Sequence, residues 1–183
     1  ALELQNFEPD IEGGYRRITG FSKYVSAIVP ATASDSEPIL MVATFGDFVL
    51  AARGTSIYSA TAGGSSWTSR DSGRTSASKY RFERYNFDGT DKIIVVDGAN
   101  DPTIFNSSLA ATDVTESTVE GSKFVAAFKN HMFYAGKSTT KQTVVFSQPA
   151  DEDAFNSGSG AGSLTVDDTI TGLKVFRDSL FIF

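Results

Sequence analysis

The chain has 183 residues, of which 40% are hydrophobic, and a formal net charge of −6 at pH 7. It has no cysteine and one histidine, His131, which excludes disulfides, thiolate metal sites and metal sites built from two histidines. The negative net charge disfavours tight binding to nucleic acid, because phosphates repel an acidic surface. No stretch approaches the roughly 18 apolar residues that a membrane-spanning helix requires.

The first 38 residues precede the first clear hairpin pattern. The stretch LELQNFEP (Leu2–Pro9) alternates as a strand does, Pro9 ends it, and Gly13–Gly14 permits a turn with positive φ. We expect residues 1–38 to form a leading arm, or an outer strand that closes a ring of sheets.

Charged residues alternate along this arm. Glu8, Asp10 and Glu12 share one face of an extended chain, and Arg16 and Arg17 follow them. The pattern fits a solvated strand edge, and it also fits a charge-complementary contact with a neighbouring copy. Under the second interpretation Arg16 and Arg17 are candidate interface residues.

A unit of an apolar run ending in phenylalanine, a short polar turn and a second apolar run recurs four times. The phenylalanines are 42, 41 and 48 residues apart, at Phe45, Phe87, Phe128 and Phe176. Each turn carries a residue that tolerates the left-handed conformation of tight hairpins, namely Asp47, Asp88, Asn130 and Asp178. Each unit is therefore expected to begin as a β-hairpin.

The remainder of the unit also repeats. A glycine follows the second strand at Gly54, Gly98 and Gly136. Third strands are expected at Thr55–Ala60, Thr103–Asn106 and Thr143–Ser147, and fourth strands at Trp67–Arg70, Leu109–Val114 and Ser163–Val166.

Four antiparallel strands in about 40–50 residues are typical of a propeller blade. The sequence therefore predicts an all-β fold, a β-propeller of four-stranded antiparallel blades, with the first three to four blades in residues 39–183. The sequence ends at Phe183 within an apolar strand, so we expect the propeller to be incomplete and the chain to continue. A β-sandwich with Greek-key connections is the alternative that the pattern leaves open.

No catalytic motif stands out. The segment Ser59–Thr68 keeps the glycine and tryptophan of the Asp-box hairpin of sialidase-type propellers, but Ala60 and Ala62 occupy its Ser and Asp positions. We interpret it as structural. His131 is expected to be an exposed turn residue, and no nucleophile elbow is present.

Two further segments resemble ligand sites only superficially. The glycine-rich stretch Ser157–Ser163 lacks the lysine of a phosphate-binding loop and is interpreted as a flexible loop between blades. The acids of Asp151–Asp153 do not match the spacing of a calcium loop. We predict that the chain is not an enzyme and holds no metal and no cofactor.

The charge changes sign within the second unit. Residues 70–84 carry five basic residues against two acidic ones, a net charge of +3, whereas residues 85–122 carry seven acids against Lys92, a net charge of −6. This is either ordinary surface scatter or a pair of patches for head-to-tail packing between copies. In the second case Arg81 and Arg84 are further candidate interface residues.

Three stretches resemble, in this order, the tail nozzle and tail-hub proteins of short-tailed bacteriophages. They are NFEPDIEGGYRRITGF (Asn6–Phe21), VVFSQPADEDAF (Val144–Phe155) and ITGLKVFRDSLFIF (Ile170–Phe183). The resemblance implies a structural virion protein, made in the host bacterial cytoplasm, that contains a β-propeller. It implies six copies in a tube that retains the genome and then lets it pass during ejection.

The partners implied by this resemblance are further copies of the chain, portal and adaptor rings, and tail fibres or spikes. Viral DNA would pass through the lumen without specific binding. Two alternatives remain: a carbohydrate-binding or sialidase-like propeller, and a propeller scaffold that binds other proteins.

Overall fold

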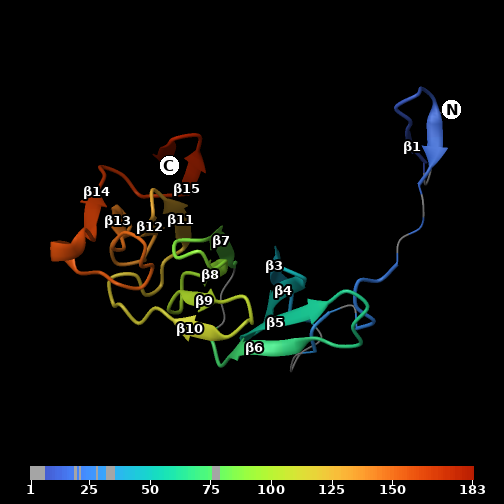
Figure 1. Cartoon of the computed structure of the whole chain (residues 1–183), viewed down its shortest axis with the longest axis horizontal. Coiled ribbons are helices and arrows are strands. Elements are labelled where there is room, and N and C mark those ends of the chain that lie inside the picture. Colours follow the sequence, from blue (N-terminus) through green and yellow to red (C-terminus); the bar gives the residue numbers. More distant parts are fainter. Residues whose placement is uncertain (1–6, 19, 21, 28, 32–35, 76–78) are drawn as a thin grey trace.

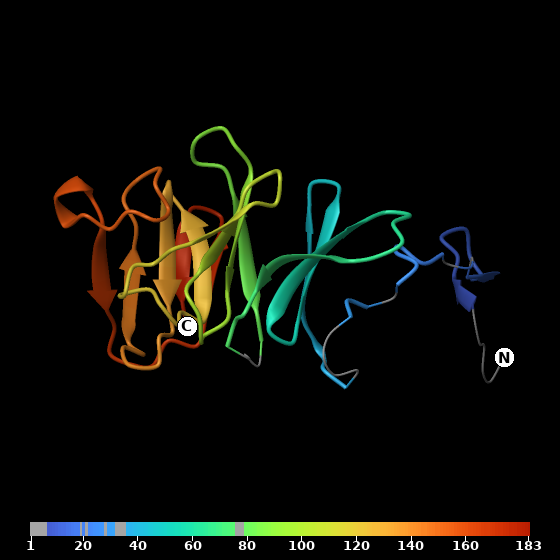
Figure 2. The same cartoon turned by 90° about the horizontal axis from the view of Figure 1, so that it is seen from below.

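The fold is a series of antiparallel sheets that follow one another along the chain (Figures 1 and 2). Three of these sheets have four strands each, and a two-stranded hairpin lies before and after them. Within the described part of the chain, no helix is long and apolar enough to cross a membrane. The computed structural model describes residues 7–18, 20, 22–27, 29–31, 36–75 and 79–183.

The first blade begins with the hairpin ILMVATF-GD-FVLAA, as expected. Its two-residue turn has the left-handed conformation at Gly46 (φ 55°) and not at Asp47, because a turn with glycine first matches the twist of the flanking strands. The four strands follow one another across the sheet in chain order: β3 (Ile39–Phe45), β4 (Phe48–Arg53), β5 (Ser56–Thr61) and β6 (Thr68–Ser72).

The second blade corrects the predicted repeat. Its first strand is the charged stretch RFERY, which ends at Tyr85, whereas Phe87 lies in the following loop with its ring centroid 4.9 Å from that of Tyr85. Tyr85 and not Phe87 is therefore the counterpart of Phe45. The strands are β7 (Arg81–Tyr85), β8 (Lys92–Val96), β9 (Thr103–Phe105) and β10 (Ala111–Asp113).

The third blade has a tight turn in which Lys129 and Asn130 are both left-handed, with φ of 47° and 62°. The expectation for Asn130 is thus confirmed, whereas the left-handed residues at the other two turns are Gly89 and Arg177 instead of Asp88 and Asp178. The strands are β11 (Phe124–Phe128), β12 (His131–Ala135), β13 (Thr143–Phe146) and β14 (Gly162–Thr165), followed by the hairpin of β15 (Leu173–Phe176) and β16 (Ser179–Ile182).

Two local expectations in the third blade were wrong. The glycine-rich stretch Ser157–Ser163 lies within the blade, where it contains the 3-10 turn η1 (Ser157–Ser159) and runs into the first residues of β14. It therefore does not connect two blades. His131 is the first residue of β12 and is half-buried, since its ring packs edge-on against Phe146 with centroids 5.7 Å apart.

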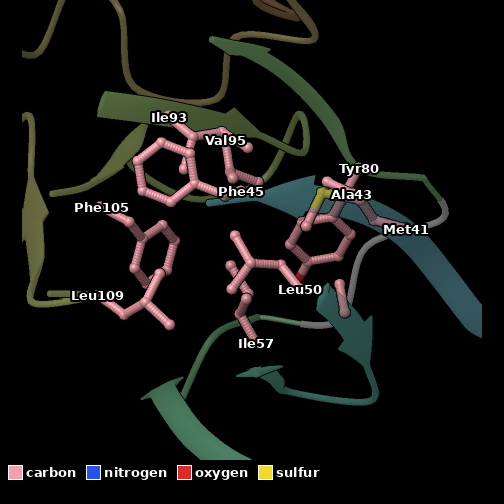
Figure 3. Packing of buried hydrophobic residues seen from close by; sticks show 11 residues of the cluster. Met41, Ala43, Phe45, Leu50, Ile57, Tyr80, Ile93, Val95, Phe105 and Leu109 are labelled. Atoms are coloured by element: carbon pink, nitrogen blue, oxygen red, sulfur yellow. The ribbon is translucent and has the colours of Figure 1, made fainter. Parts of the chain in front are cut away.

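The sheets pack face to face, and this explains the apolar run of β8. Ile93 and Val95 lie in a core shared with the first blade, whereas Ile94 and Val96 lie in a core shared with the third. Figure 3 shows the first of these cores, where Phe45 and Leu50 meet Phe105 and residues of β8. A strand buried on both faces loses the usual polar–apolar alternation.

A third core joins the third blade to the last hairpin through Val144, Ile170, Leu173 and Ile182. The initial strands β7, β11 and β15 lie side by side. The prediction of an all-β fold with four-stranded antiparallel propeller blades is confirmed, and the third and fourth strands of each blade lie within two residues of their predicted positions.

The amino-terminal hairpin is separate from the blades. Strands β1 (Phe7–Pro9) and β2 (Tyr15–Arg17) pair only with each other and lie at one end of the molecule (Figures 1 and 2). Of the leading arm expected over residues 1–38, this hairpin covers residues 7–18, and only these residues are called the arm below. Most of the strand expected over Leu2–Pro9 lies outside the described residues.

Candidate interaction surfaces

The structure does not bring the four candidate arginines together. Arg16 and Arg17 lie on the arm, and Arg81 and Arg84 lie on β7 of the second blade. Arg81 and Arg84 are the candidates for head-to-tail packing against another copy. They point to opposite faces of β7, because Arg81 pairs across from Val96 and Arg84 across from Ile93.

Each of these two arginines contacts a neighbouring blade of its own chain. The Arg81 guanidinium donates to the Lys123 carbonyl at 3.1 Å and lies 4.5 Å from the centroid of the Phe124 ring. Arg84 reaches Thr44 of the first blade at 3.4 Å. Both side chains therefore contribute to packing between blades.

The arm exposes both charged and apolar side chains. Arg16 Nε donates to Glu8 Oε1 at 2.7 Å, but the two side chains are 62% and 44% exposed, so the pair contributes between zero and about 1 kcal/mol. Ile11 is fully exposed and Tyr15 is 66% exposed. A two-stranded hairpin is marginally stable alone in water, which makes the arm a candidate for contact with another surface.

An ionic cluster that sequence reasoning missed joins the first two blades. Arg74, in the connection between these blades, donates to Asp97 Oδ2 at 2.8 Å and to Asp71 Oδ2 at 2.6 Å. It also donates to Thr103 Oγ1 at 2.6 Å. Arg74 belongs to the basic window that was expected to form a surface patch, yet its side chain is only 5% exposed.

The groups of this cluster hold one another in their charged forms. Burial alone would lower the pKa of Arg74, but the hydrogen bonds to Asp97 and Asp71 outweigh it and raise that pKa. Burial alone would raise the pKa of Asp97, but donors that include the Ala99 amide, Arg74 and the Asn100 amide lower it. The cluster is therefore a charged link between two blades.

A second ionic link joins the second blade to the long loop between β13 and β14. Glu152 is buried, and its carboxylate accepts a hydrogen bond from Lys92 at 2.8 Å. The backbone carbonyl of Glu152 accepts from the Tyr134 hydroxyl at 2.6 Å. Glu152 therefore holds the loop that carries Asp151–Asp153 against the second and third blades. This loop is the one weighed above as a calcium site.

An extended segment lies on the first blade. We call residues 24–27 and 29–31 the strap. Val25 pairs with Gly64 in an isolated parallel bridge, with the Ser26 amide donating to the Gly64 carbonyl at 3.0 Å and the Gly63 amide donating to the Tyr24 carbonyl at 2.8 Å. The strap is therefore bound at the end of the blade where β5 turns into β6 (Figure 2).

Side chains of the first blade also hold the strap, through its backbone carbonyls. The donors and acceptors are Trp67 Nε1 to Ala27 O at 2.8 Å, Tyr58 Oη to Ala31 O at 3.1 Å, and Arg53 Nη1 to Pro30 O. The Asp-box-like segment thus supplies, in Trp67, a donor for the strap. This agrees with its structural interpretation.

The last hairpin presents an aromatic face. Phe176, Phe181 and Phe183 are 60%, 45% and 64% exposed, and the ring centroids of consecutive members of this set lie 6.4 Å apart. Lys174 shares this face, since it pairs with Phe181. Leu173 and Ile182 point to the other side, into the core with the third blade.

His131 and the acidic side chains are the groups weighed above for catalysis or metal binding. His131 Nδ1 lies 2.6 Å from the Ser147 carbonyl oxygen, which occupies one of its two ring nitrogens. No three His, Asp or Glu side chains of the described ranges are grouped to hold a metal ion. A hollow of about 480 Å³ lies at the turns of the first two blades and is lined by residues that include Phe45, Arg84 and Lys92.

Comparisons with known proteins give only distant similarities. No model of a protein family and no curated protein matches the chain. Among solved structures, the N-terminal domain of Nup159 is similar with a TM-score of 0.49 and 9% identity, over 76% of this chain and 37% of that one. BBS1N, solved in complex with ARL6DN, is similar with a TM-score of 0.47 and 11% identity, over 84% of this chain and 49% of that one.

The chain therefore spans less than half the length of either structure. Because both scores lie below 0.5, neither similarity bears on the function of this chain.

Proposed function

We propose that this chain is a non-catalytic structural domain, whose stacked blades form a rigid scaffold for protein assembly. The observation that supports this most is where its buried charged groups lie. Arg74 with Asp97 joins the first blade to the second, and Lys92 with Glu152 joins the second blade to the third. Both pairs connect sheets within the chain, as expected of groups that stiffen a scaffold.

Within this class we favour a ring subunit of a bacteriophage tail nozzle. The proposal rests on the three stretches that resemble that family, which fall on the arm and on the third blade with the last hairpin. Asn6–Phe21 includes the exposed arm, Val144–Phe155 includes β13 and the loop anchored by Glu152, and Ile170–Phe183 forms the last hairpin. In this role the chain would assemble with itself, with portal and adaptor rings above and fibres at the side, around a DNA channel.

A propeller scaffold that binds other proteins is the second candidate. The arm favours it, because it is a marginally stable hairpin with exposed apolar side chains, Ile11 and Tyr15, that another protein surface can cover. This candidate needs neither a ring nor a channel.

Negative-stain microscopy of the purified full chain, with mass measurement in solution, tests the proposal. A hollow ring with six-fold symmetry is the expected result for a nozzle subunit. A monomer at all accessible concentrations contradicts the nozzle and leaves the protein-binding scaffold. Hydrolysis of a sialoside or another glycoside by the purified chain would contradict the non-catalytic role itself.

A further inference from the structure

A groove lies between the third blade and the connection that leads to it from the second blade. One wall is residues 116–118 of that connection, and the other is the outer part of the third blade, with Val145 of β13, Ser163 of β14 and Phe155. The loops that follow β12 and β13 also line it. We call this space, about 460 Å³ in volume, the blade groove; sites for small ligands range over about 300–1,000 Å³.

The walls of the blade groove are fixed by contacts within the chain. The connection is anchored by Val114 and Val119, which are 1% and 0% exposed and belong to the core between the second and third blades. Lys137 Nζ, from the loop after β12, donates to the Ser117 carbonyl and so ties this loop to the connection. The groove is therefore formed before any ligand arrives.

Hydroxyl groups dominate its lining. Seven of the lining residues are serine or threonine, and the side-chain hydroxyls of Thr118, Thr140 and Ser163 form no hydrogen bond with another described residue. Ser163 pairs with Val145 across β13 and β14, so its hydroxyl lies on the same face as the apolar side chain. Each hydroxyl can both donate and accept a hydrogen bond.

An aromatic ring lies beside these hydroxyls. Phe155 is half-buried, packs against the core between the second and third blades, and has its ring centroid 5.7 Å from that of Tyr134. Its contacts with the core hold the ring in place, and the ring also lines the blade groove. An apolar ring next to donors and acceptors matches the two sides of a sugar, which has C–H faces and hydroxyl edges.

The charges that line the blade groove are balanced and already paired. One acid, Glu116, and one base, Lys137, are among the described lining residues. Glu116 Oε1 accepts from the Thr118 amide at 3.1 Å, and Lys137 donates to the Ser117 carbonyl. Phosphate or sulfate groups are bound by arginine or lysine side chains that are free to pair with them, so the lining fits an uncharged ligand.

We infer that the blade groove binds a short segment of a neutral carbohydrate. Hydrolysis of a glycosidic bond uses two carboxyl groups on either side of the bond, and Glu116 is the one carboxylate among the described residues that line the groove. The groove therefore binds the sugar without cleaving it. This inference goes beyond the proposed function and does not depend on ring assembly, since both walls belong to one chain.

Titration of the full chain followed by ¹H–¹⁵N NMR tests the inference. The probes are maltohexaose, cellohexaose and chitohexaose, with a heparin hexasaccharide and a proline-rich decapeptide as comparison ligands. At least one of the three neutral sugars should produce saturable shifts of the amides of Thr118, Thr140 and Ser163. The heparin fragment and the peptide should leave these amides unshifted.

A variant without two of the hydroxyls gives the second readout. The double change Thr118→Val and Ser163→Ala removes hydroxyls at exposed positions and keeps the size of the side chains nearly constant. Calorimetry should show at least about a fivefold loss of affinity for the sugar, because two hydrogen bonds are removed. The matched control is Thr112→Val, exposed on β10 and outside the groove, which should bind as the wild type does.

Four results would overturn the inference: no saturable shift with any of the three neutral sugars, shifts confined to residues outside the blade groove, equal affinity of the double variant and the wild type, or preferential binding of the heparin fragment. Shifts of the groove amides by the decapeptide alone would assign the groove to extended peptides and overturn it as well. None of these results alters the microscopy of the chain, so the inference and the proposed function fail separately.

Discussion

Buried charge is the feature of single residues that most distinguishes this chain. Arg74 donates hydrogen bonds to Asp71, Asp97 and Thr103, which lie in three different parts of the chain. Its partners Asp97 and Thr103 are 23 and 29 residues away, which is why a count of charges along the sequence placed Arg74 in a surface patch. The role of such a residue depends on the fold, and local sequence does not reveal it.

Removal of Arg74 should be strongly destabilising. The change Arg74→Met leaves Asp97 buried without its main cationic partner, and breaking a buried pair from one side costs about 3–5 kcal/mol. Urea denaturation measures this loss in the free energy of unfolding.

The matched control is Arg16→Met, which breaks an exposed pair and should change stability by less than about 1 kcal/mol. Equal effects of the two changes would show that the Arg74 cluster does not connect the blades.

Acid should weaken the same cluster. The folded-state pKa of Asp97 lies below its ordinary value, so the folded protein holds the charged form more favourably than the unfolded chain does. The stabilisation is complete above the unfolded pKa, about 3.9, and it is lost as pH falls through the folded pKa.

The change Asp97→Asn should therefore flatten the fall of unfolding free energy below about pH 4. Thermal denaturation of both proteins over a series of acidic buffers measures this. Parallel curves for the variant and the wild type would contradict the assigned role of Asp97.

Among the elements, the hairpins formed by two apolar runs and the third and fourth strands of the blades were predictable, whereas β7 and the strap were not. Aspartate or asparagine at turns, together with apolar runs, located the hairpins of β3–β4, β11–β12 and β15–β16. Strand β7 was missed because Arg81 and Arg84 interrupt its apolar pattern, each contacting a different neighbouring blade. The strap was missed because its contacts use backbone carbonyls, which any sequence provides.

A glycine recurs after the second strand of each blade, and mutation can test whether the position requires it. Gly136 has φ 80°, and a β-carbon there would lie 2.6 Å from the Phe124 ring. Gly73 has a similar φ of 79° and open space around it. Gly136→Ala should therefore cost about 1–3 kcal/mol more than Gly73→Ala, because overpacking is added to the backbone strain.

Chemical denaturation of the two alanine variants gives this difference directly. If Gly73→Ala proves as damaging as Gly136→Ala, the close contact between Gly136 and β11 is not what the position requires.

At the scale of the whole molecule, sequence reasoning recovered the architecture but not the surfaces. The recurring units predicted stacked four-stranded blades, and the structure has them. The candidate interface residues did not gather on one surface, because alternate residues of a strand face opposite blades. The strap became visible only in the structure, because its contacts join residues far apart in the sequence.

The fold depends on the face-to-face stacking of consecutive blades, because each core lies between two of them. Hydrogen–deuterium exchange resolved along the chain tests this most directly, because amides of doubly covered strands open only with the whole fold. We predict the slowest exchange in β8 (Lys92–Val96) and β12 (His131–Ala135), slower exchange there than in β16, and the fastest exchange in the arm. Exchange in β8 as fast as in β16 would contradict the stacked arrangement.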